Sequence, residues 1–351
     1  MKQLSKSRIE NHKSKVVVLL LLAIAILGCD SWKTAPPSTN AQAAEPSNPA
    51  AQPAANVEPL GREMQVDGER AMQYVREIVA FGPRWPGSKG QEKVATYLRN
   101  KLKADHLEED AFTADTPAGK LPMRNFIAKF EGTKDGIIVL GSHIDTLYPP
   151  KGNNFVGAND GGSSTGLLLA IADQLRGKKL EGYSVWLAFL DGEEAINNWS
   201  DADSVYGSRH LAAKWQQDGT IGKIKAFLLA DMIGDADLDI LRDVNSTPWL
   251  EELVLQAAQR LGYQSHFFAR EDAVGDDHQP FAKLGVPVAD LIDFSYGYNN
   301  SYWHTPQDTM DKLSGRSLKI TGDVMLETIR LVNGRHQAAR SITGQSAFWS
   351  S

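Results

Sequence analysis

The stretch from Tyr183 to Ala195 constrains the fold more than any other part of this chain. A largely apolar run, Tyr183 to Leu190, stops abruptly at Asp191, Glu193 and Glu194. Such a run is typical of a strand buried on both faces of a parallel sheet, and open α/β sheets bind ligands at the carboxyl ends of these strands. Two neighbouring glutamates in a cleft need a cation or a shared proton to compensate them. A solvated helix start would also accommodate such a pair.

Strand and helix signals alternate along residues 66–336 and predict one large α/β domain. Ser88, with Gln91 three residues later, has the spacing of a helix capping box. The expected helices are Gly68–Ala80, Ser88–Ala104, one through Leu167 to Leu175, Ser204–Gln217, Thr247–Leu261, a short one after His278, and Ser317–Asn333. The expected strands are Met123–Phe130, Gly136–Gly141, Tyr183–Leu190, Lys225–Ile233, an edge strand Gln264–Ala269, and Val286–Ile292.

Composition narrows the classes of partner. Hydrophobic residues make up 42% of the 351, which is enough for a buried core, and the formal net charge is -6. An acidic chain lacks the basic surface that nucleic-acid binding requires, so we expect no nucleic acid as a partner. Acidic groups in a cleft instead suit a metal cation or a substrate amine.

The N-terminal region predicts export and a lipid anchor. Basic residues precede an apolar segment, Val16–Leu27, that is too short for an ordinary membrane-spanning helix. The only cysteine, Cys29, ends a Leu-Gly-Cys sequence that resembles a bacterial lipobox. We therefore expect a lipoprotein signal peptide at residues 1–29 and an anchored extracytoplasmic protein, in the periplasm or at the cell surface. An uncleaved signal anchor is the alternative. Residues 30–65 are rich in Pro and Ala and predict a disordered linker, and residues 337–351 predict a frayed tail.

Polar residues able to bind metal or move protons follow several expected strands. They are His143 or Asp145, Glu193 and Glu194, Asp231 and His304, and Asp160 comes from the glycine-rich loop Gly157–Gly162. The loop lacks the Gly-Lys-Ser/Thr of a phosphate-binding loop, so we expect it to aim Asp160 into the cleft. A mixed set of oxygen and nitrogen ligands is typical of a catalytic zinc, which binds about three protein groups and keeps one position open.

Each of these residues also has a structural explanation when taken alone. His143 can be a hydrogen-bonded core histidine, Asp160 a helix cap, and Asp231 and His304 structural residues. Trp199 and Trp303 can pack in the core, although Trp199 lies in a polar loop and Trp303 adjoins His304.

The sequence resembles the animal-type glutaminyl-peptide cyclotransferases, or glutaminyl cyclases, of the zinc aminopeptidase superfamily. The resemblance runs from about residue 70 to 333, and its most specific part is the acidic and tryptophan-containing segment from Asp191 to Ala212. Further matches in the same order are Gly157–Asp160, Asp231–Gly234, Asp276–Phe281, Gly285–Val288 and Trp303–Thr305. The resemblance implies a three-layer α/β/α fold with a mixed, mostly parallel central sheet, as in the zinc aminopeptidases.

The resemblance also implies roles for the site residues. Asp160, Glu194 and His304 match the three zinc ligands, and Glu193 matches the catalytic acid/base. Five other positions match supporting groups: carboxyls hydrogen-bonded around that glutamate, the aromatic walls of the substrate pocket, and a histidine near the metal. These are Asp231 and Asp276, Trp199 and Trp303, and His143, respectively.

Three features depart from the cyclase pattern. Asp290 stands where the cyclases have a histidine, and the segment Asp293–Tyr302 is longer. The cyclases' disulfide is also absent, because the chain has one cysteine.

Three functions follow from these observations. The leading hypothesis is zinc-dependent cyclisation of N-terminal glutamine, on peptides or proteins, to pyroglutamate with release of ammonia, by a monomer holding one zinc ion. The alternative is a two-metal aminopeptidase in which His143, Asp160 and Asp231 hold a second zinc and Glu193 activates a bridging water. The third is a non-catalytic binding domain of the same fold, which predicts that ligand residues are missing.

Overall fold

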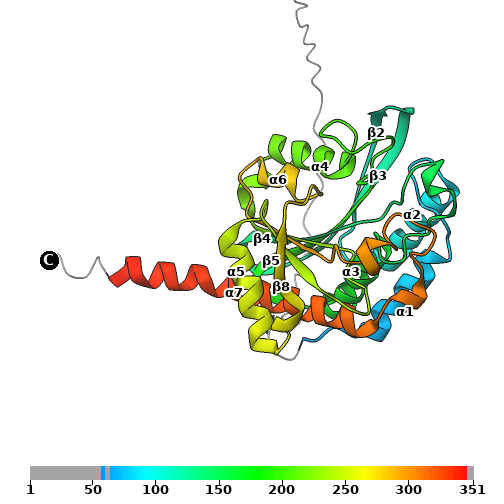
Figure 1. Cartoon of the computed structure of the whole chain (residues 1–351). Helices are drawn as coiled ribbons and strands as arrows, with labels where there is room; N and C mark the ends of the chain where they lie inside the picture. Colours follow the sequence, from blue (N-terminus) through cyan, green and yellow to red (C-terminus); the bar gives the residue numbers. More distant parts are fainter. Residues whose placement is uncertain (1–56, 60–63, 346–351) are drawn as a thin grey trace, which may run out of the picture. The chain divides into compact units, whose positions relative to one another are not determined.

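The strand expected at residues 183–190 runs through the middle of the sheet. The computed structural model describes residues 57–59 and 64–345. In it, β5 (Lys179–Leu190) lies between β3 (Gly119–Phe130) and β4 (Gly132–His143), and the sheet has the order β2-β3-β5-β4-β6-β9 (Figure 1). β4, β5, β6 and β9 are parallel, whereas β2 and β3 form an antiparallel hairpin. The remaining strands are β1 (Val57–Pro59), β2 (Glu108–Thr116), β6 (Ile224–Asp231), β9 (Val288–Ile292), and the separate pair β7 (Ile240–Asp243) and β8 (Phe267–Asp272).

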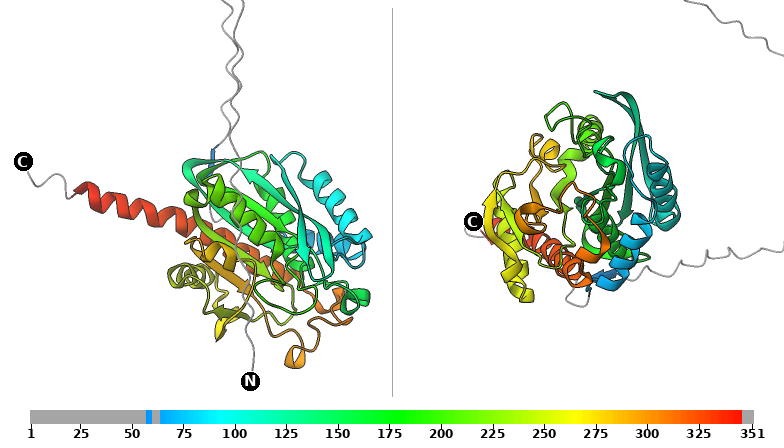
Figure 2. Two further views of the ribbon diagram at one scale, coloured as in Figure 1. Left: turned by 90° about the horizontal axis from the view of Figure 1, so that it is seen from above. Right: turned by 45° about the vertical axis from the view of Figure 1, so that its right-hand side comes forward.

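Helices cover both faces of this sheet, which confirms the predicted three-layer α/β/α fold. One face carries α1 (Gly68–Val79), α2 (Lys89–Leu102), α3 (Gly162–Leu175), α5 (Pro248–Leu261) and α7 (Gly315–Gln345). The other carries α4 (Tyr206–Gln217) and the short α6 (Gln279–Ala282), and Figure 2 shows the layers from two further directions. Short 3-10 turns occur at Lys151–Asn154, Thr220–Lys223, Gln264–His266, Tyr298–Asn300 and Met310–Lys312.

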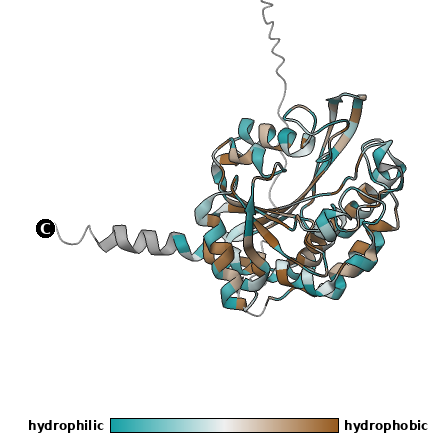
Figure 3. Ribbon diagram, viewed as in Figure 1, coloured by the Kyte–Doolittle hydropathy of each residue, from teal (hydrophilic) through white to brown (hydrophobic). Residues whose placement is uncertain are grey.

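Alternation along the central strands builds a separate core on each face. Ile138 and Leu140 of β4 belong to the larger core under α1, α3 and α7, whereas Val139 between them belongs to the core under α4 and α6. Because successive side chains of a strand point to opposite faces, one apolar run supplies both cores. Apolar colour is therefore concentrated along the central strands in Figure 3.

Ser88 caps the start of α2 as predicted, whereas the Gln91 side chain bonds to the residue before the cap and to the acidic turn after β5. Ser88 Oγ accepts a hydrogen bond from the Gln91 backbone N–H at 3.0 Å. Gln91 Oε1 accepts one from the Gly87 N–H, and its Nε2 donates to Asp191 Oδ2 at 2.6 Å. A local helix-start signal thus helps to fix the turn that carries Glu193 and Glu194.

The element boundaries contain several corrections. Helix α7 continues to Gln345 instead of ending near Asn333, so the predicted tail at 337–351 begins too early. The segment after Asn333 contains good helix formers and no proline, which allows the helix to continue. The hairpin strand β2 and the short β7 were not predicted, and the edge strand is Phe267–Asp272 rather than 264–269.

The predicted signal peptide with Cys29 and most of the predicted linker lie outside the described residues. Within the part of the chain that the structure describes, no helix combines the length and apolar character needed to cross a bilayer.

Candidate metal and catalytic site

The parallel strands deliver the predicted site residues to one edge of the sheet. His143 is the last residue of β4 and pairs in register with Leu190 at the end of β5, directly before the acidic turn. Asp231 is likewise the last residue of β6, and pairs with Ile292 at the end of β9. The carboxyl ends of four neighbouring strands therefore meet at this edge, as expected for a ligand site in an open α/β sheet.

Asp160, Glu194 and His304 form a compact group of potential metal ligands. His304 Nε2 lies 3.3 Å from Asp160 Oδ2 and 3.3 Å from Glu194 Oε1. Both of these oxygens are buried and have no hydrogen-bond partner. Burial and repulsion from Asp160 raise the pKa of Glu194 to about 7, although His304 opposes this shift. Two unpartnered carboxylate oxygens beside an imidazole nitrogen, with the imidazole partly exposed, fit a divalent cation with one open position.

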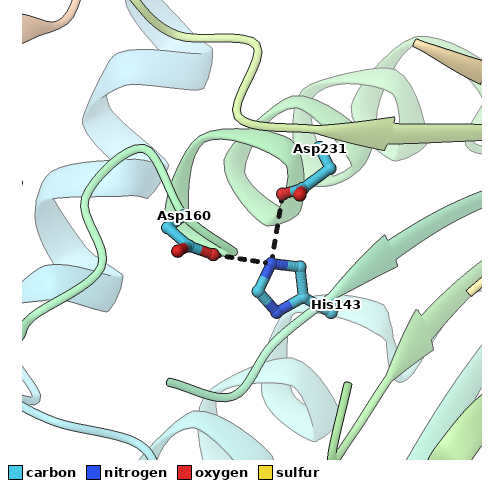
Figure 4. Close-up of side chains that lie close together, drawn as sticks. All are labelled: His143, Asp160 and Asp231. Atoms are coloured by element: carbon cyan, nitrogen blue, oxygen red, sulfur yellow. Dashed lines mark hydrogen bonds and ion pairs between the residues drawn. The ribbon is translucent and has the colours of Figure 1, made fainter. Parts of the chain in front are cut away.

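His143 forms a second group with Asp160 and Asp231. Its Nε2 lies 3.1 Å from Asp160 Oδ1 and 3.1 Å from Asp231 Oδ1, and Figure 4 shows both carboxylates facing this nitrogen. Asp160 therefore belongs to both groups through its two oxygens. Its pKa is lowered: burial opposes ionisation, but the two histidines stabilise the carboxylate. The arrangement accommodates either a hydrogen-bonded His143 or a second metal ion.

Glu193 lies beside these groups and carries a strongly shifted pKa. Its side chain is buried, and burial with the negative charges of Asp276 and Glu194 raises its pKa well above the ordinary value, although His143 opposes the shift. Asp276, in the loop before α6, is buried and also has a raised pKa. A carboxyl group with a raised pKa is suited to exchange protons with a substrate.

Two buried carboxylates hold the backbone of the ligand-bearing loops. Asp145 accepts hydrogen bonds from the N–H groups of Glu193 and Glu194 at 3.0 and 3.2 Å. Asp308 accepts from the N–H groups of Asn159 and Asp160 at 2.7 and 3.1 Å. These bonds fix the loops independently of any bound ion.

A fully buried arginine completes this support. Arg84 donates from its guanidinium to the carbonyl oxygens of Ile144, Val156 and Gly157. Burial lowers its pKa to about 10, although nearby carboxylates, first Asp308, oppose the shift. It therefore remains a cation under the acidic site at neutral pH.

The site opens into a pocket of about 460 Å³ that both predicted tryptophans line. Trp303 stacks on His304 with ring centroids 4.0 Å apart, and Phe294 packs against the edge of Trp303. Trp199 is 47% exposed, so it forms part of the rim and not of the core. The pocket wall thus combines aromatic surface with the carboxyl groups at its base.

All the predicted site residues in the described part of the chain converge at this pocket or directly beneath it. Of these, His143 and Asp145 do not line the pocket: His143 bonds to Asp231 under it, and Asp145 bonds to the backbone of the acidic turn. Sequence reasoning missed Arg84, Asp308 and Phe294. Nothing in the local sequence marks Asp308 as a partner of residue 160. His210 stacks on Phe112 and does not line the pocket.

Comparisons with known proteins agree with this geometry. Residues 125–329 match peptidase family M28. This chain belongs to that family. A glutaminyl-peptide cyclotransferase-like protein from Bos taurus is 35% identical over 275 residues, which cover 70% of each chain. A solved glutaminyl cyclase from an Acidobacteriales bacterium is 52% identical with a TM-score of 0.76, covering 78% of this chain and 97% of that one.

These similarities confirm the resemblance to glutaminyl cyclases within the M28 family. A solved Zn-dependent exopeptidase from Parabacteroides distasonis is also similar, at 27% identity and a TM-score of 0.68, covering 76% of this chain and 99% of that chain. The oxygen and nitrogen ligands of this M28 chain fit zinc as well.

Proposed function

We propose that this protein is a zinc-dependent glutaminyl-peptide cyclotransferase that converts N-terminal glutamine of peptides or proteins to pyroglutamate. The observation that carries the proposal is the position of Glu193, beside the Asp160–Glu194–His304 group and at the base of a tryptophan-lined pocket. The similarity of the chain to the bovine and Acidobacteriales proteins supports the same reaction. All the predicted ligands are present, which disfavours a non-catalytic binding domain.

In this reaction the substrate's α-amino nitrogen attacks the carbonyl carbon of its own side-chain amide. A carbon–nitrogen bond forms to that amine, and the bond to the amide nitrogen breaks, so that ammonia leaves. Because nucleophile and electrophile belong to one molecule, the enzyme's main tasks are to orient the substrate and move protons. Glu193 takes a proton from the attacking amine and returns it to the leaving nitrogen. Trp199 and Trp303 enclose the substrate side chain and restrict water.

Asp160, Glu194 and His304 would hold zinc, which when bound supplies a Lewis acid for the amide carbonyl oxygen. We propose one zinc ion per chain. His143 then remains hydrogen-bonded to Asp160 and Asp231, with its Nε2 3.1 Å from one oxygen of each. The aminopeptidase alternative requires a second ion at the same three residues.

A paired assay separates these two functions. The purified protein is given a glutaminyl peptide and a leucyl anilide, and its zinc content is measured after mild dialysis. We expect ammonia and pyroglutamyl peptide from the first substrate, no aniline from the second, and one zinc per chain. Two retained zinc ions together with turnover of the leucyl substrate alone would contradict the cyclase assignment.

We further propose that Cys29 is lipidated and anchors a monomeric enzyme to a membrane surface outside the cytoplasm. The basic segment, the short apolar segment and the Leu-Gly-Cys sequence support this proposal. Wild-type protein should lose its signal peptide, sediment with membranes and incorporate labelled fatty acid. Cys29→Ser should incorporate no labelled fatty acid, and no protein without the signal peptide should sediment with membranes. A Cys29→Ser protein that is processed and anchored as before would contradict lipidation at this residue.

A further inference from the structure

A second pocket adjoins the catalytic pocket. It has a volume of about 230 Å³ and is lined by residues of α4, of α6 and of the segments next to them. Trp199 and Asp276 line both pockets. The Trp199 indole packs against the backbone directly before Asp276, since a Cβ added at Gly275 would lie 2.9 Å from its Nε1. These two side chains therefore form a wall that the pockets share, and we call the second one the adjoining pocket.

Apolar side chains form much of the wall of the adjoining pocket. Trp199 is 47% exposed, although tryptophan is highly buried on average in folded proteins. Ala213 of α4 is exposed, and Leu284 after α6 is partly exposed. The other apolar residues of the lining are Val205, Ala212 and Pro280. The methyl group of Ala213 leaves space beside the indole for a large apolar side chain of a ligand.

Most of the polar side chains that line this pocket are already bonded to the protein. Arg209 donates from Nε and Nη2 to two backbone carbonyl oxygens of the loop before α4. Ser204 Oγ and Gln279 Nε2 each donate to a backbone carbonyl oxygen, at 2.8 and 2.9 Å. Lys283 pairs with Asp201 at 3.6 Å. A polar ligand group would compete with these bonds, whereas an apolar one would gain by leaving water.

The substrate's own chain is the ligand best placed to enter the adjoining pocket. In the proposed reaction the N-terminal glutamine occupies the catalytic pocket, and the rest of the peptide leaves through the mouth of that pocket. Trp199 stands at this mouth and is also a wall of the adjoining pocket. Each extended residue advances a peptide by at most about 3.5 Å, so only the first residues after the glutamine pass this ring.

We propose that the adjoining pocket is a substrate subsite that binds a large apolar side chain at the second or third position of the peptide, between Trp199, Ala213 and Leu284. This inference rests on the proposed function and names its substrate class. The enzyme acts best on glutaminyl peptides in which a large apolar residue follows the glutamine within two positions. The exposed indole then has a role in both pockets.

A series of glutaminyl peptides tests the subsite. Each peptide is amidated at its C-terminus and carries alanine, phenylalanine, glutamate or lysine at the second, third or sixth position, with alanine elsewhere. We expect phenylalanine at the second or third position to raise kcat/KM about 5- to 30-fold over alanine, and phenylalanine at the sixth position to have no effect. Equal kcat/KM for alanine and phenylalanine at both near positions, or a preference for glutamate or lysine over phenylalanine, would overturn the proposal.

Variants of the wall show whether the preference comes from this pocket. Ala213→Trp fills it from an exposed position, so the ratio of kcat/KM for the phenylalanine peptide to that for the alanine peptide should fall below about twofold. Leu284→Ala removes part of the wall and should lower this ratio about threefold. Gln217→Trp is the matched control, because residue 217 is exposed on the same helix and lines neither pocket. A wild-type ratio in Ala213→Trp, or an equal loss in Gln217→Trp, would refute the subsite.

The ratio compares two peptides on one protein sample, so it does not depend on the active fraction of that sample. Should Ala213→Trp fail to fold, an unchanged ratio in Leu284→Ala would refute the subsite and the threefold loss would support it. If the wild-type protein forms pyroglutamate from no glutaminyl peptide, the proposed function is refuted. If it cyclises all the peptides with equal kcat/KM, only the subsite is refuted, so the two failures are distinguishable.

Discussion

Glu193 and Glu194 are neighbours in the sequence but have different surroundings. Glu194 faces His304, whose positive charge favours its ionised form, whereas Glu193 faces Asp276, whose negative charge disfavours it. Different environments give two adjacent carboxyls an electrostatic and a proton-transfer role, as in other enzymes with paired acids.

Replacing Glu193 should therefore abolish chemistry without removing the metal. We expect Glu193→Gln to lower kcat about 100- to 10,000-fold, because the amide cannot accept the amine proton. Steady-state kinetics on a glutaminyl peptide and metal analysis of the same sample measure this. A variant that turned over normally would show that another group transfers the proton.

Replacing His304 should instead weaken zinc binding. Its Nε2 is the one nitrogen in the Asp160–Glu194–His304 group, so His304→Gln should lower zinc affinity about 10-fold or more, with activity partly restored by added zinc. Competition with a chelator gives the affinity. His210→Gln, away from the pocket, is the control, and an unchanged zinc affinity in His304→Gln would rule out the assigned ligand.

The convergence of His143, Glu193, Glu194 and Asp231 could be predicted because each terminates or closely follows an apolar strand, and strand ends converge by topology. The groups that support them could not. Arg84 acts through three backbone carbonyls, and Asp308 through two backbone N–H groups, so neither contact leaves a pattern in the sequence. The hydrogen bonds of Asp231 also differ from expectation: it bonds to His143, whereas the resemblance implied a bond to Glu193.

The elements nearest the site meet through very close backbone packing. Gly207, in the first turn of α4, lies so near the acidic turn that an added Cβ would be 2.3 Å from the Asp191 carbonyl oxygen and 2.5 Å from Asn125 Oδ1. Position 207 of helix α4 must therefore be occupied by glycine, which has no side chain.

We expect Gly207→Ala to displace α4 from the acidic turn and lower kcat at least about 10-fold, since small misplacements of catalytic groups are costly. Gly222→Ala is a matched control, because an added Cβ there meets nothing within 4 Å. Equal activity of the two variants would show that the turn adjusts without cost.

Helix α5 gives the fold a pH dependence that does not involve the site. Burial raises the pKa of Glu251 from 4.5 to about 7, although Arg242 opposes the shift. Between these two values the folded state binds more protons than the unfolded state, so this residue lowers stability as pH rises. In Glu251→Gln that loss, on the order of 1 kcal/mol after allowance for solvent screening, should disappear. Urea unfolding at several pH values measures the difference, and parallel curves for both proteins would contradict it.

Strands with long apolar runs were predicted correctly, whereas the short strand β7 and the polar strand β2 were not. β5, β4 and β6 in the middle of the sheet and β9 at its end contain continuous apolar runs, but β2 consists largely of charged and small residues. β2 is a strand because it pairs with β3 along its whole length. The sequence of β2 alone does not indicate this pairing.

At the scale of the whole molecule, every residue assigned as a ligand, proton carrier or pocket wall lies between 143 and 304, and the supporting Arg84 and Asp308 also belong to the compact unit Pro53–Ser351. A chain that begins at residue 53 should therefore keep kcat/KM on a soluble glutaminyl peptide within about twofold of the detergent-purified full chain. Light scattering on the same sample should give a monomer mass. A large loss of activity would show that the N-terminal residues contribute to catalysis.

The hydrogen bonds of Arg84, Asp145 and Asp308 have a consequence for the metal-free protein. Because protein groups already fix the backbone on both sides of the ligands, zinc need not organise its own site, and its binding is uncoupled from folding. The zinc-free protein should then stay folded, and the rate of its activation should be limited by zinc binding and not by a folding step. Exchange for another ion, such as cobalt as a spectroscopic reporter, should proceed without refolding.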